Sequence, residues 1–172
     1  MKLSKAILSL IIVLSAFNLV KADPPTLSTA LNTVTKTYLG IKNALVTNNA
    51  IEAENMAKDM ISALNAVPEK EMTAEQHKLW FDYLNKLEFD SRHISESNPV
   101  DHKREHFASL STNLFIVLKA FKLNTATIYK QYCPMKKAYW ISETATIKNP
   151  YYGIGSMVTC GTTKEVLKGD NK

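Results

Sequence analysis

Apolar side chains recur every three or four residues through the first two-thirds of the chain. Four stretches show this spacing, at residues 27–45, 53–67, 79–87 and 107–121. The spacing places the apolar residues of each stretch on one stripe of a helix, because an α-helix completes a turn in 3.6 residues. The chain is therefore predicted to form four amphipathic helices.

The segments between these stretches carry signals for helix ends. Asn49 is suited to cap the second helix, and Thr73 with Gln76 three residues later is a capping box for the third. Asn98 and Pro99 provide an N-cap and a first-turn proline for the fourth helix. Each predicted helix after the first therefore has a defined start.

These elements predict an all-α fold class. We expect residues 23–124 to form a four-helix up-down bundle that contains no sheet, because short connections make successive helices antiparallel. The residues expected to face inward are Leu31, Tyr38, Leu64, Trp80, Leu84, Leu114 and Leu118.

The last part of the chain has a different composition. Residues 125–132 are rich in β-branched and aromatic side chains, and four of the five glycines follow residue 124. Such a composition favours loops and short strands over another long helix. We expect an irregular C-terminal cap with short strands over about residues 125–165, within the same domain as the helices.

Both cysteines of the chain lie in this cap, and each has a methionine close by. Cys133 is followed by Met135, and Met157 precedes Cys160. Thiolate and thioether sulfurs are soft, polarisable donors, which suit Cu(I) or Ag(I) better than harder ions. These four residues are the candidate ligands of a soft-metal site.

The same two cysteines also fit a purely structural role. Two cysteines in an exported protein most simply form a disulfide, and a bridge here closes a loop of 28 residues, which contributes roughly 3–4 kcal/mol. Both interpretations require Cys133 and Cys160 to lie close together, and Pro150, Gly153 and Gly155 are predicted to bend the chain back for this. The residues alone leave metal binding and a Cys133–Cys160 disulfide open.

Histidines are further candidate ligands. His102 and His106 are four residues apart on the predicted fourth helix, so they share a face. His106 lies beside the buried stripe and is predicted to be an auxiliary metal ligand or a hydrogen-bond donor near the metal. His102 belongs to the charged run at residues 101–105, which we expect to be a solvated face.

The sequence shows no catalytic constellation. Cys133 or Cys160 with His106 would supply a nucleophile and a base, but neither thiol has a third orienting residue or an oxyanion-hole glycine motif. The chain also lacks a phosphate-binding glycine loop and the paired Glu-x-x-His motifs of di-metal bundles. We predict that the protein is not an enzyme.

The first 22 residues have the pattern of a secretory signal peptide. Lys2 and Lys5 precede an apolar run over residues 6–20. This run is shorter than the roughly 20 residues that span a bilayer. We expect cleavage near Ala22, a periplasmic or secreted product, and no stable membrane insertion after cleavage.

Removal of this segment lowers the positive charge. The chain carries +5, but three of its 21 basic residues and none of its 16 acidic residues lie in residues 1–22. Residues 23–172, predicted to be a single domain, therefore carry only +2 and contain no cluster of lysine and arginine. Nucleic acid is not an expected partner.

Several motifs together resemble those of a bacterial exported domain-of-unknown-function family. The similar segments are Cys133-Pro134-Met135, residues 140–142, residues 147–153 and residues 157–161 in the cap, with residues 38–45 and 104–111 in the helical part. The resemblance runs from about residue 31 to residue 161. Members of that family occur as single exported proteins and at the C-terminal end of periplasmic adaptor (membrane fusion) subunits of copper/silver efflux pumps.

The resemblance implies a role in copper or heavy-metal handling or efflux, with a metal ion and periplasmic efflux-pump components as partners. The expected function is an exported Cu(I)- or Ag(I)-binding protein. The alternative is a periplasmic interaction module without metal, whose cap is held by a Cys133–Cys160 disulfide. The barrel domain and long coiled-coil hairpin of pump adaptors have no counterpart in this sequence, so we do not expect the chain itself to transport metal.

Overall fold

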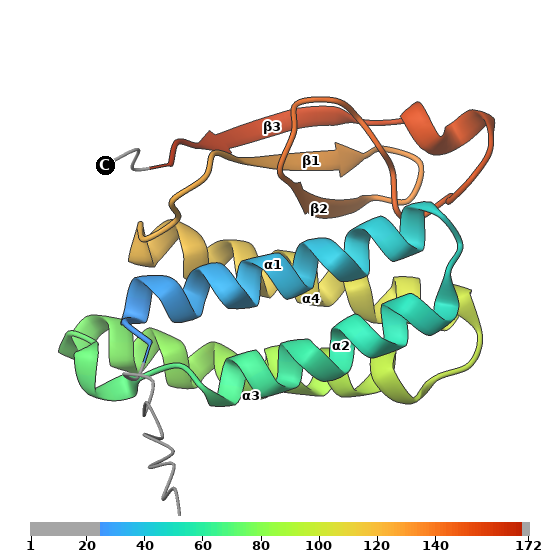
Figure 1. Cartoon of the computed structure of the whole chain (residues 1–172). Coiled ribbons are helices and arrows are strands. Elements are labelled where there is room, and N and C mark those ends of the chain that lie inside the picture. The colour runs from blue at the N-terminus through green and yellow to red at the C-terminus, as the bar shows by residue number, and fades with distance from the viewer. Residues whose placement is uncertain (1–24, 170–172) are drawn as a thin grey trace, which may run out of the picture.

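The computed structural model describes residues 25–169 of the chain (Figure 1). The helical part comprises α1 (Leu27–Val46), α2 (Ala50–Asn65), the short 3-10 helix η1 (Glu69–Glu71), α3 (Ala74–Glu96) and α4 (Val100–Phe121). The C-terminal part comprises β1 (Ile128–Cys133), β2 (Ala138–Ser142), the 3-10 helix η2 (Ser156–Thr159) and β3 (Thr162–Leu167). The predicted signal peptide lies outside the described residues. Within residues 25–169, no helix is long and apolar enough to cross a membrane.

Side chains near the helix starts satisfy backbone N–H groups that lack a partner within the helix. The Asn49 side chain accepts a hydrogen bond from the backbone N–H three residues later at 3.0 Å. Thr73 and Gln76 form the predicted capping box at the start of α3. The prediction for α4 is wrong by one residue, because its N-cap is Pro99 rather than Asn98, and no side chain caps this helix.

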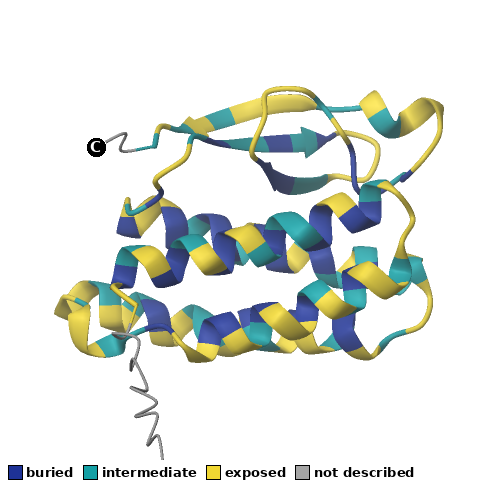
Figure 2. Ribbon diagram, viewed as in Figure 1, coloured by how far each residue is buried: buried dark blue, intermediate teal, exposed yellow. Residues whose placement is uncertain are grey.

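The four predicted helices are confirmed, and their apolar stripes face one another. Each helix contacts the next along the chain, and α1 also contacts α4. Figure 2 shows buried residues on the helix sides that face each other. Of the seven residues predicted to face inward, six are buried and Leu84 is partly buried against the same core.

The C-terminal part forms a regular sheet, so the fold is not purely all-α. Its three antiparallel strands have the order β2-β1-β3, with Cys133 of β1 opposite Ala138 of β2. β-branched and aromatic residues favour strands that pack on a surface, and β1 is paired on both sides. The expected short strands are present, but they form a three-stranded antiparallel sheet rather than an irregular cap, with η2 in the connection between β2 and β3.

The sheet lies over the layer formed by α1 and α4, with α2 and α3 on the far side of that layer (Figure 1). Its contacts with the helices come mainly from β2, which packs on α4 and α1. Trp140 and Ile141 of β2 are buried, as is Tyr151 in the loop that follows. The sheet thus extends the helical core.

A buried polar chain joins β2 to the helices. The Ile141 backbone N–H donates to the Tyr38 hydroxyl at 3.0 Å, and this hydroxyl lies 2.6 Å from the Ser111 hydroxyl. Ser111 donates in turn to the Phe107 carbonyl at 2.6 Å. Burial raises the pKa of Tyr38, so its hydroxyl stays protonated and is available as a donor to Ser111.

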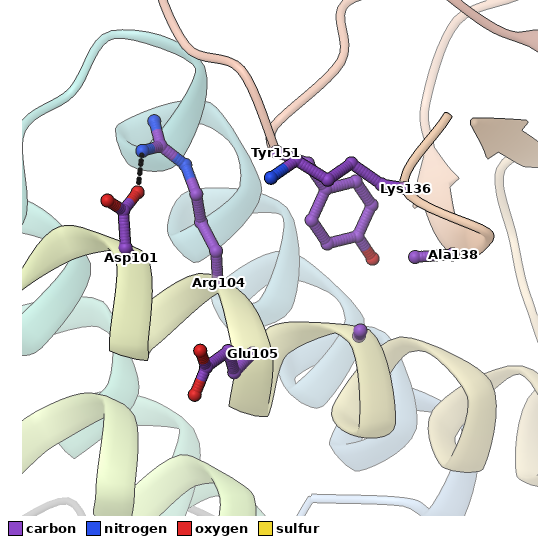
Figure 3. Close-up of a pocket in the computed structure, with 7 residues that line it drawn as sticks. Asp101, Arg104, Glu105, Lys136, Ala138 and Tyr151 are labelled. Carbon is purple, nitrogen blue, oxygen red and sulfur yellow. Dashed lines mark hydrogen bonds and ion pairs between the residues drawn. The ribbon is translucent and has the colours of Figure 1, made fainter. Parts of the chain in front are cut away.

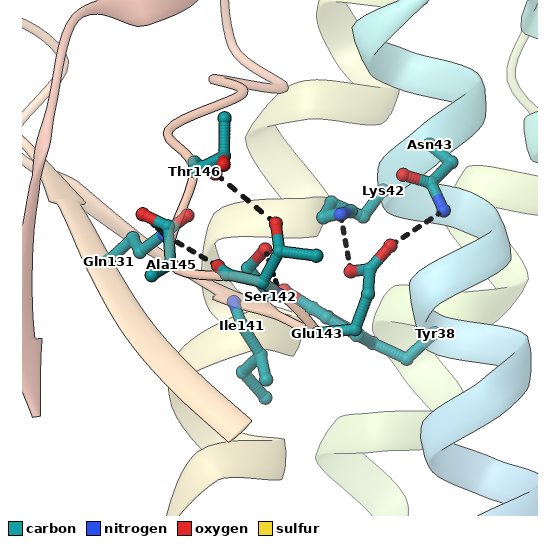
Figure 4. Close-up of polar contacts among 10 residues, drawn as sticks. Tyr38, Lys42, Asn43, Gln131, Ile141, Ser142, Glu143, Ala145 and Thr146 are labelled. Carbon is teal, nitrogen blue, oxygen red and sulfur yellow. Dashed lines mark hydrogen bonds and ion pairs between the residues drawn. The ribbon is translucent and has the colours of Figure 1, made fainter. Parts of the chain in front are cut away.

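An ion pair joins the end of β2 to α1 (Figure 4). The buried Lys42 ammonium lies 2.6 Å from the Glu143 carboxylate, which also accepts from Asn43 at 3.3 Å. Burial lowers the pKa of Lys42, although Glu143 opposes this shift. Burial disfavours the charge of Glu143 as well, but the hydrogen bonds and the ammonium outweigh it and lower its pKa.

The charged run at residues 101–105 is not a uniformly solvated face, which corrects the expectation. Lys103 is buried and donates to the Ile94 carbonyl at 2.6 Å. Arg104 donates to the Pro150 carbonyl at 2.8 Å and to the Leu45 carbonyl at 3.2 Å. Arg104 therefore ties the end of α1 and the loop after β2 to α4.

Candidate metal centre

Cys133 lies at the end of the central strand, where the chain turns into β2. It is fully buried, and the Lys136 backbone N–H donates to its sulfur at 3.4 Å. Pro134 favours an extended conformation in the residue before it, which matches the place of Cys133 in a strand. Lys137 adopts a left-handed conformation with φ of 52° and closes the tight connection to β2.

Cys160 lies directly after η2, as the C-cap residue of this short helix. Its backbone N–H donates to the Met157 carbonyl at 3.0 Å. Asn149 is fully buried and donates to the Cys160 carbonyl at 2.6 Å, while its side-chain oxygen accepts from the Tyr151 N–H at 2.9 Å. These bonds fix the loop that carries Cys160.

Gly153 and Gly155 bend this loop, as the sequence predicted. Gly153 has φ of 63° and Gly155 has φ of 147°, conformations that residues with a side chain rarely adopt. Gly161 has φ of 154°, and an added Cβ at this position would lie 2.6 Å from the Trp140 ring. The strand after Cys160 can therefore pass closely over the indole.

The prediction that the two cysteines lie close together is confirmed. Their sulfur atoms are 4.0 Å apart, and both residues carry free thiols in this structure. Two metal–sulfur bonds of about 2.3 Å that span this separation enclose an angle of about 120°. The pair can therefore hold one ion between them while leaving a side of the ion open for a further ligand.

The surroundings of the Cys160 sulfur favour its protonated state. Desolvation and then the neighbouring Cys133 sulfur raise the pKa of the Cys160 thiol. A bound cation reverses this balance because it stabilises thiolates, and its binding releases protons. The geometry thus places two potential thiolate donors 4.0 Å apart.

Tyr152 lies close to both sulfurs, a placement that sequence reasoning missed. Desolvation raises the pKa of its hydroxyl, and so do charges on Cys133 and Cys160. The Lys136 ammonium lies 5.3 Å from the centre of the Tyr152 ring. Nothing in the spacing of this tyrosine along the sequence relates it to Cys133.

The two methionines lie next to the cysteines along the chain, in accessible positions. Met135 occupies the turn after Cys133 with 67% of its surface exposed, and Met157 is the second residue of η2 with 37% exposed. In a 3-10 helix, residues three apart lie on one side, so Met157 and Cys160 share a side of this turn. Both thioethers are therefore free of the core and can turn toward an ion.

His106 has a different set of neighbours. Its Nδ1 lies 3.1 Å from the Asp90 carboxylate, and its ring packs near His93, His102 and Phe89 on α3 and α4. Within residues 25–169, the structure records no contact between His106 and either cysteine.

A hollow of about 330 Å³ lies between α4 and the turn after Cys133 (Figure 3). Its lining residues are Asp101, Arg104, Glu105, Ala108, Lys136, Ala138 and Tyr151. Side chains of both charge signs line it, and the Arg104 guanidinium forms an ion pair with the Asp101 carboxylate at 2.9 Å. Neither Cys133 nor Cys160 is among its lining residues.

Comparison with known proteins gives a family but no function. The chain belongs to the family described as "Protein of unknown function (DUF3347)", whose model matches residues 34–126. No curated protein and no solved structure matches the chain. The matched residues end before β1, so both cysteines lie outside the family match.

Proposed function

We propose that the protein is an exported carrier or store of a soft monovalent metal ion, Cu(I) or Ag(I), held by Cys133 and Cys160. The observation that carries this proposal is the 4.0 Å separation of the two sulfurs, which come from segments 27 residues apart in the chain. Thiolates provide the negative charge that neutralises a monovalent ion, and soft sulfur donors select Cu(I) and Ag(I).

A thioether completes the proposed set of ligands. Met157 is the favoured third ligand because the Cys160 N–H donates to the Met157 carbonyl at 3.0 Å and so closes a 3-10 turn between the two residues. Met135 is the alternative from the turn after Cys133. Asn149 and the Lys136 N–H orient the two cysteines through their hydrogen bonds. His106 is not needed in this set, because its recorded partners lie on α3 and α4.

The proposed biological setting is copper or heavy-metal handling or efflux in the periplasm. It rests on the sequence resemblance to exported proteins and pump-adaptor domains, and on the signal-peptide pattern of residues 1–22. In this proposal the helices, arranged as an up-down bundle, serve as the scaffold that holds β1 and the Cys160 loop in register. Efflux-pump components are the proposed partners.

Anaerobic competition with a Cu(I) chelator tests the proposal. The reduced protein is expected to withdraw one Cu(I) per chain. The double variant Cys133→Ser/Cys160→Ser should lose this ability, because the serine hydroxyl is a hard donor that does not replace a thiolate. Met157→Leu should weaken binding, and Met72→Leu is the matched control because Met72 lies between η1 and α3.

The outcome that contradicts the proposal is equal competition by the double serine variant and the wild-type protein. Thiol titration of the freshly exported protein separates the alternative function. A quantitative disulfide that is not reduced under periplasmic conditions would favour the interaction module held by a Cys133–Cys160 bridge. Free thiols would favour the metal carrier.

A further inference from the structure

Three of the four histidines of the chain gather where α3 meets α4. Ring centroids are 4.4 Å apart for His93 and His106, 4.8 Å for His102 and His106, and 6.4 Å for His93 and His102. His93 belongs to the last turns of α3, whereas the other two belong to the first turns of α4. The packing of the two helices thus adds His93 to the pair visible in the sequence.

Each of these rings has an oxygen atom near its Nδ1. The three pairs are His106 with the Asp90 carboxylate at 3.1 Å, His93 with the Phe89 carbonyl at 3.1 Å, and His102 with the Glu105 carboxylate at 3.3 Å. Carbonyl and ionised carboxylate oxygens only accept hydrogen bonds, so in the neutral rings Nδ1 carries the proton and Nε2 keeps its lone pair. Metal-bound histidines have this arrangement, in which an oxygen at one nitrogen orients the other toward the ion.

We propose that His93, His102 and His106 form a second metal site, separate from the sulfur pair, for a divalent ion that prefers imidazole, with Zn(II) as its representative. Imidazole nitrogen suits Zn(II), whereas the two thiols suit softer ions. An ion about 2.0–2.1 Å from three Nε2 atoms in a tetrahedral arrangement holds the ring centroids about 5 Å apart. Two of the observed centroid separations, 4.4 and 4.8 Å, are shorter than this value, and the third, 6.4 Å, is longer.

Binding an ion requires the imidazole rings to rotate. The rings of His93 and His106 are partly stacked, with planes 31° apart. Within the part of the chain that the structure describes, no three His, Cys, Asp or Glu side chains already stand in position to hold an ion. His102 is 43% exposed, so its ring has the freedom to turn toward the other two.

The charges around the cluster suit a cation. Asp90 is almost completely buried, with 4% of its side chain exposed, and its recorded side-chain partner is His106. Glu105 adds a second carboxylate on α4, and no lysine or arginine is recorded in contact with the three rings in residues 25–169. A divalent ion would therefore be partly neutralised by two carboxylates that do not touch it.

Zn(II) titration of the Cys133→Ser/Cys160→Ser protein tests this site, because the background removes the thiols as competing ligands. One equivalent is expected to bind, and Co(II) in its place should give the visible absorption of a nitrogen-coordinated tetrahedral ion. In this background His93→Ala and His106→Ala should each lower the Zn(II) affinity by at least tenfold, and Asp90→Asn by about tenfold. His77→Ala is the matched control, since His77 lies on α3 outside the cluster.

Circular dichroism of each variant confirms that the helices are retained, and His102→Ala provides a second test at an exposed position where folding is least affected. Zn(II) affinity that is unchanged in both His93→Ala and His102→Ala would overturn the proposal. An equal loss in His77→Ala would do the same, because it would show adventitious binding by surface histidines. Neither result bears on Cu(I) binding by the cysteines, so the two proposals fail separately.

Discussion

The Tyr38 hydroxyl holds β2 on the helices, so its removal should measure how firmly the sheet is attached. Tyr38→Phe removes one oxygen from a site with no solvent exposure. The Ile141 N–H then loses its acceptor, while Ser111 keeps its bond to the Phe107 carbonyl. One buried backbone donor is therefore left without a partner.

The magnitude follows from this unsatisfied donor. Leaving a buried donor unpaired costs about 1–3 kcal/mol, and the phenylalanine ring itself fills the same space as the tyrosine ring. We expect the free energy of unfolding to fall by about 2 kcal/mol. For a domain of this size such a loss corresponds to a Tm lower by about 4–8 °C.

Urea unfolding followed by circular dichroism measures the effect. Tyr129→Phe is the matched control, because the structure records no hydrogen bond from the Tyr129 hydroxyl to any described residue. A loss of less than about 0.5 kcal/mol in Tyr38→Phe, or an equal loss in Tyr129→Phe, would refute the reasoning. Either result would show that the Tyr38 hydroxyl is not needed to satisfy the buried Ile141 N–H. A double-mutant cycle with Ser111→Ala should show coupling between the two hydroxyls.

Three further changes test the site and its support. Asn149→Ala removes the bond to the Cys160 carbonyl and should lower Cu(I) affinity about tenfold in the chelator competition, with folding retained by circular dichroism. Gly161→Ala places a Cβ against the neighbouring indole at an unfavourable φ and should lower the free energy of unfolding by at least 1 kcal/mol in urea. Glu143→Gln should cost about 1–2 kcal/mol at pH 7, since the buried Lys42 loses its counter-charge while the carboxylate is 38% exposed. Because the pKa of Glu143 is lowered in the folded state, its contribution is present above the ordinary value of 4.5 and is lost as the pH falls through the lowered pKa. Wild-type unfolding curves should therefore lose more stability than those of Glu143→Gln on acidification below pH 4.5, and parallel losses would contradict the assignment.

The helices could be predicted from the sequence because each has a local cause. The apolar spacing and the capping box at Thr73 and Gln76 act within a few residues, and both appear in the structure. The sheet was only partly predictable, because the strand composition of residues 125–132 is local but the pairing of β1 with β3 joins distant segments. Lys103 was assigned to a solvated face because the sequence does not show that its ammonium reaches the end of α3.

The candidate site, like the fold, was only partly predictable from the sequence. The proximity of Cys133 and Cys160 was predictable because both the metal and the disulfide interpretations require it. The bends at Gly153 and Gly155 that allow it are a local property of the backbone. Asn149 and Tyr152 gave no signal, because their roles depend on contacts across the loop that only the folded chain creates. His93 joins His106 only through the packing of α3 on α4, so a single-helix spacing could not identify it.

The order of the elements along the chain determines when the sulfur pair can assemble. α1 to α4 contact their neighbours in sequence, and contacts of this kind form early in folding. β2 docks on a surface that α1 and α4 create together, and Cys160 lies two residues before β3, which pairs with β1. A chain synthesised from its N-terminus therefore completes the helices while its two thiols are still apart. Under the proposed function, an ion held between both sulfurs would therefore mark a fully folded molecule, and a chain truncated before Thr162 should keep its helices but lose Cu(I) binding.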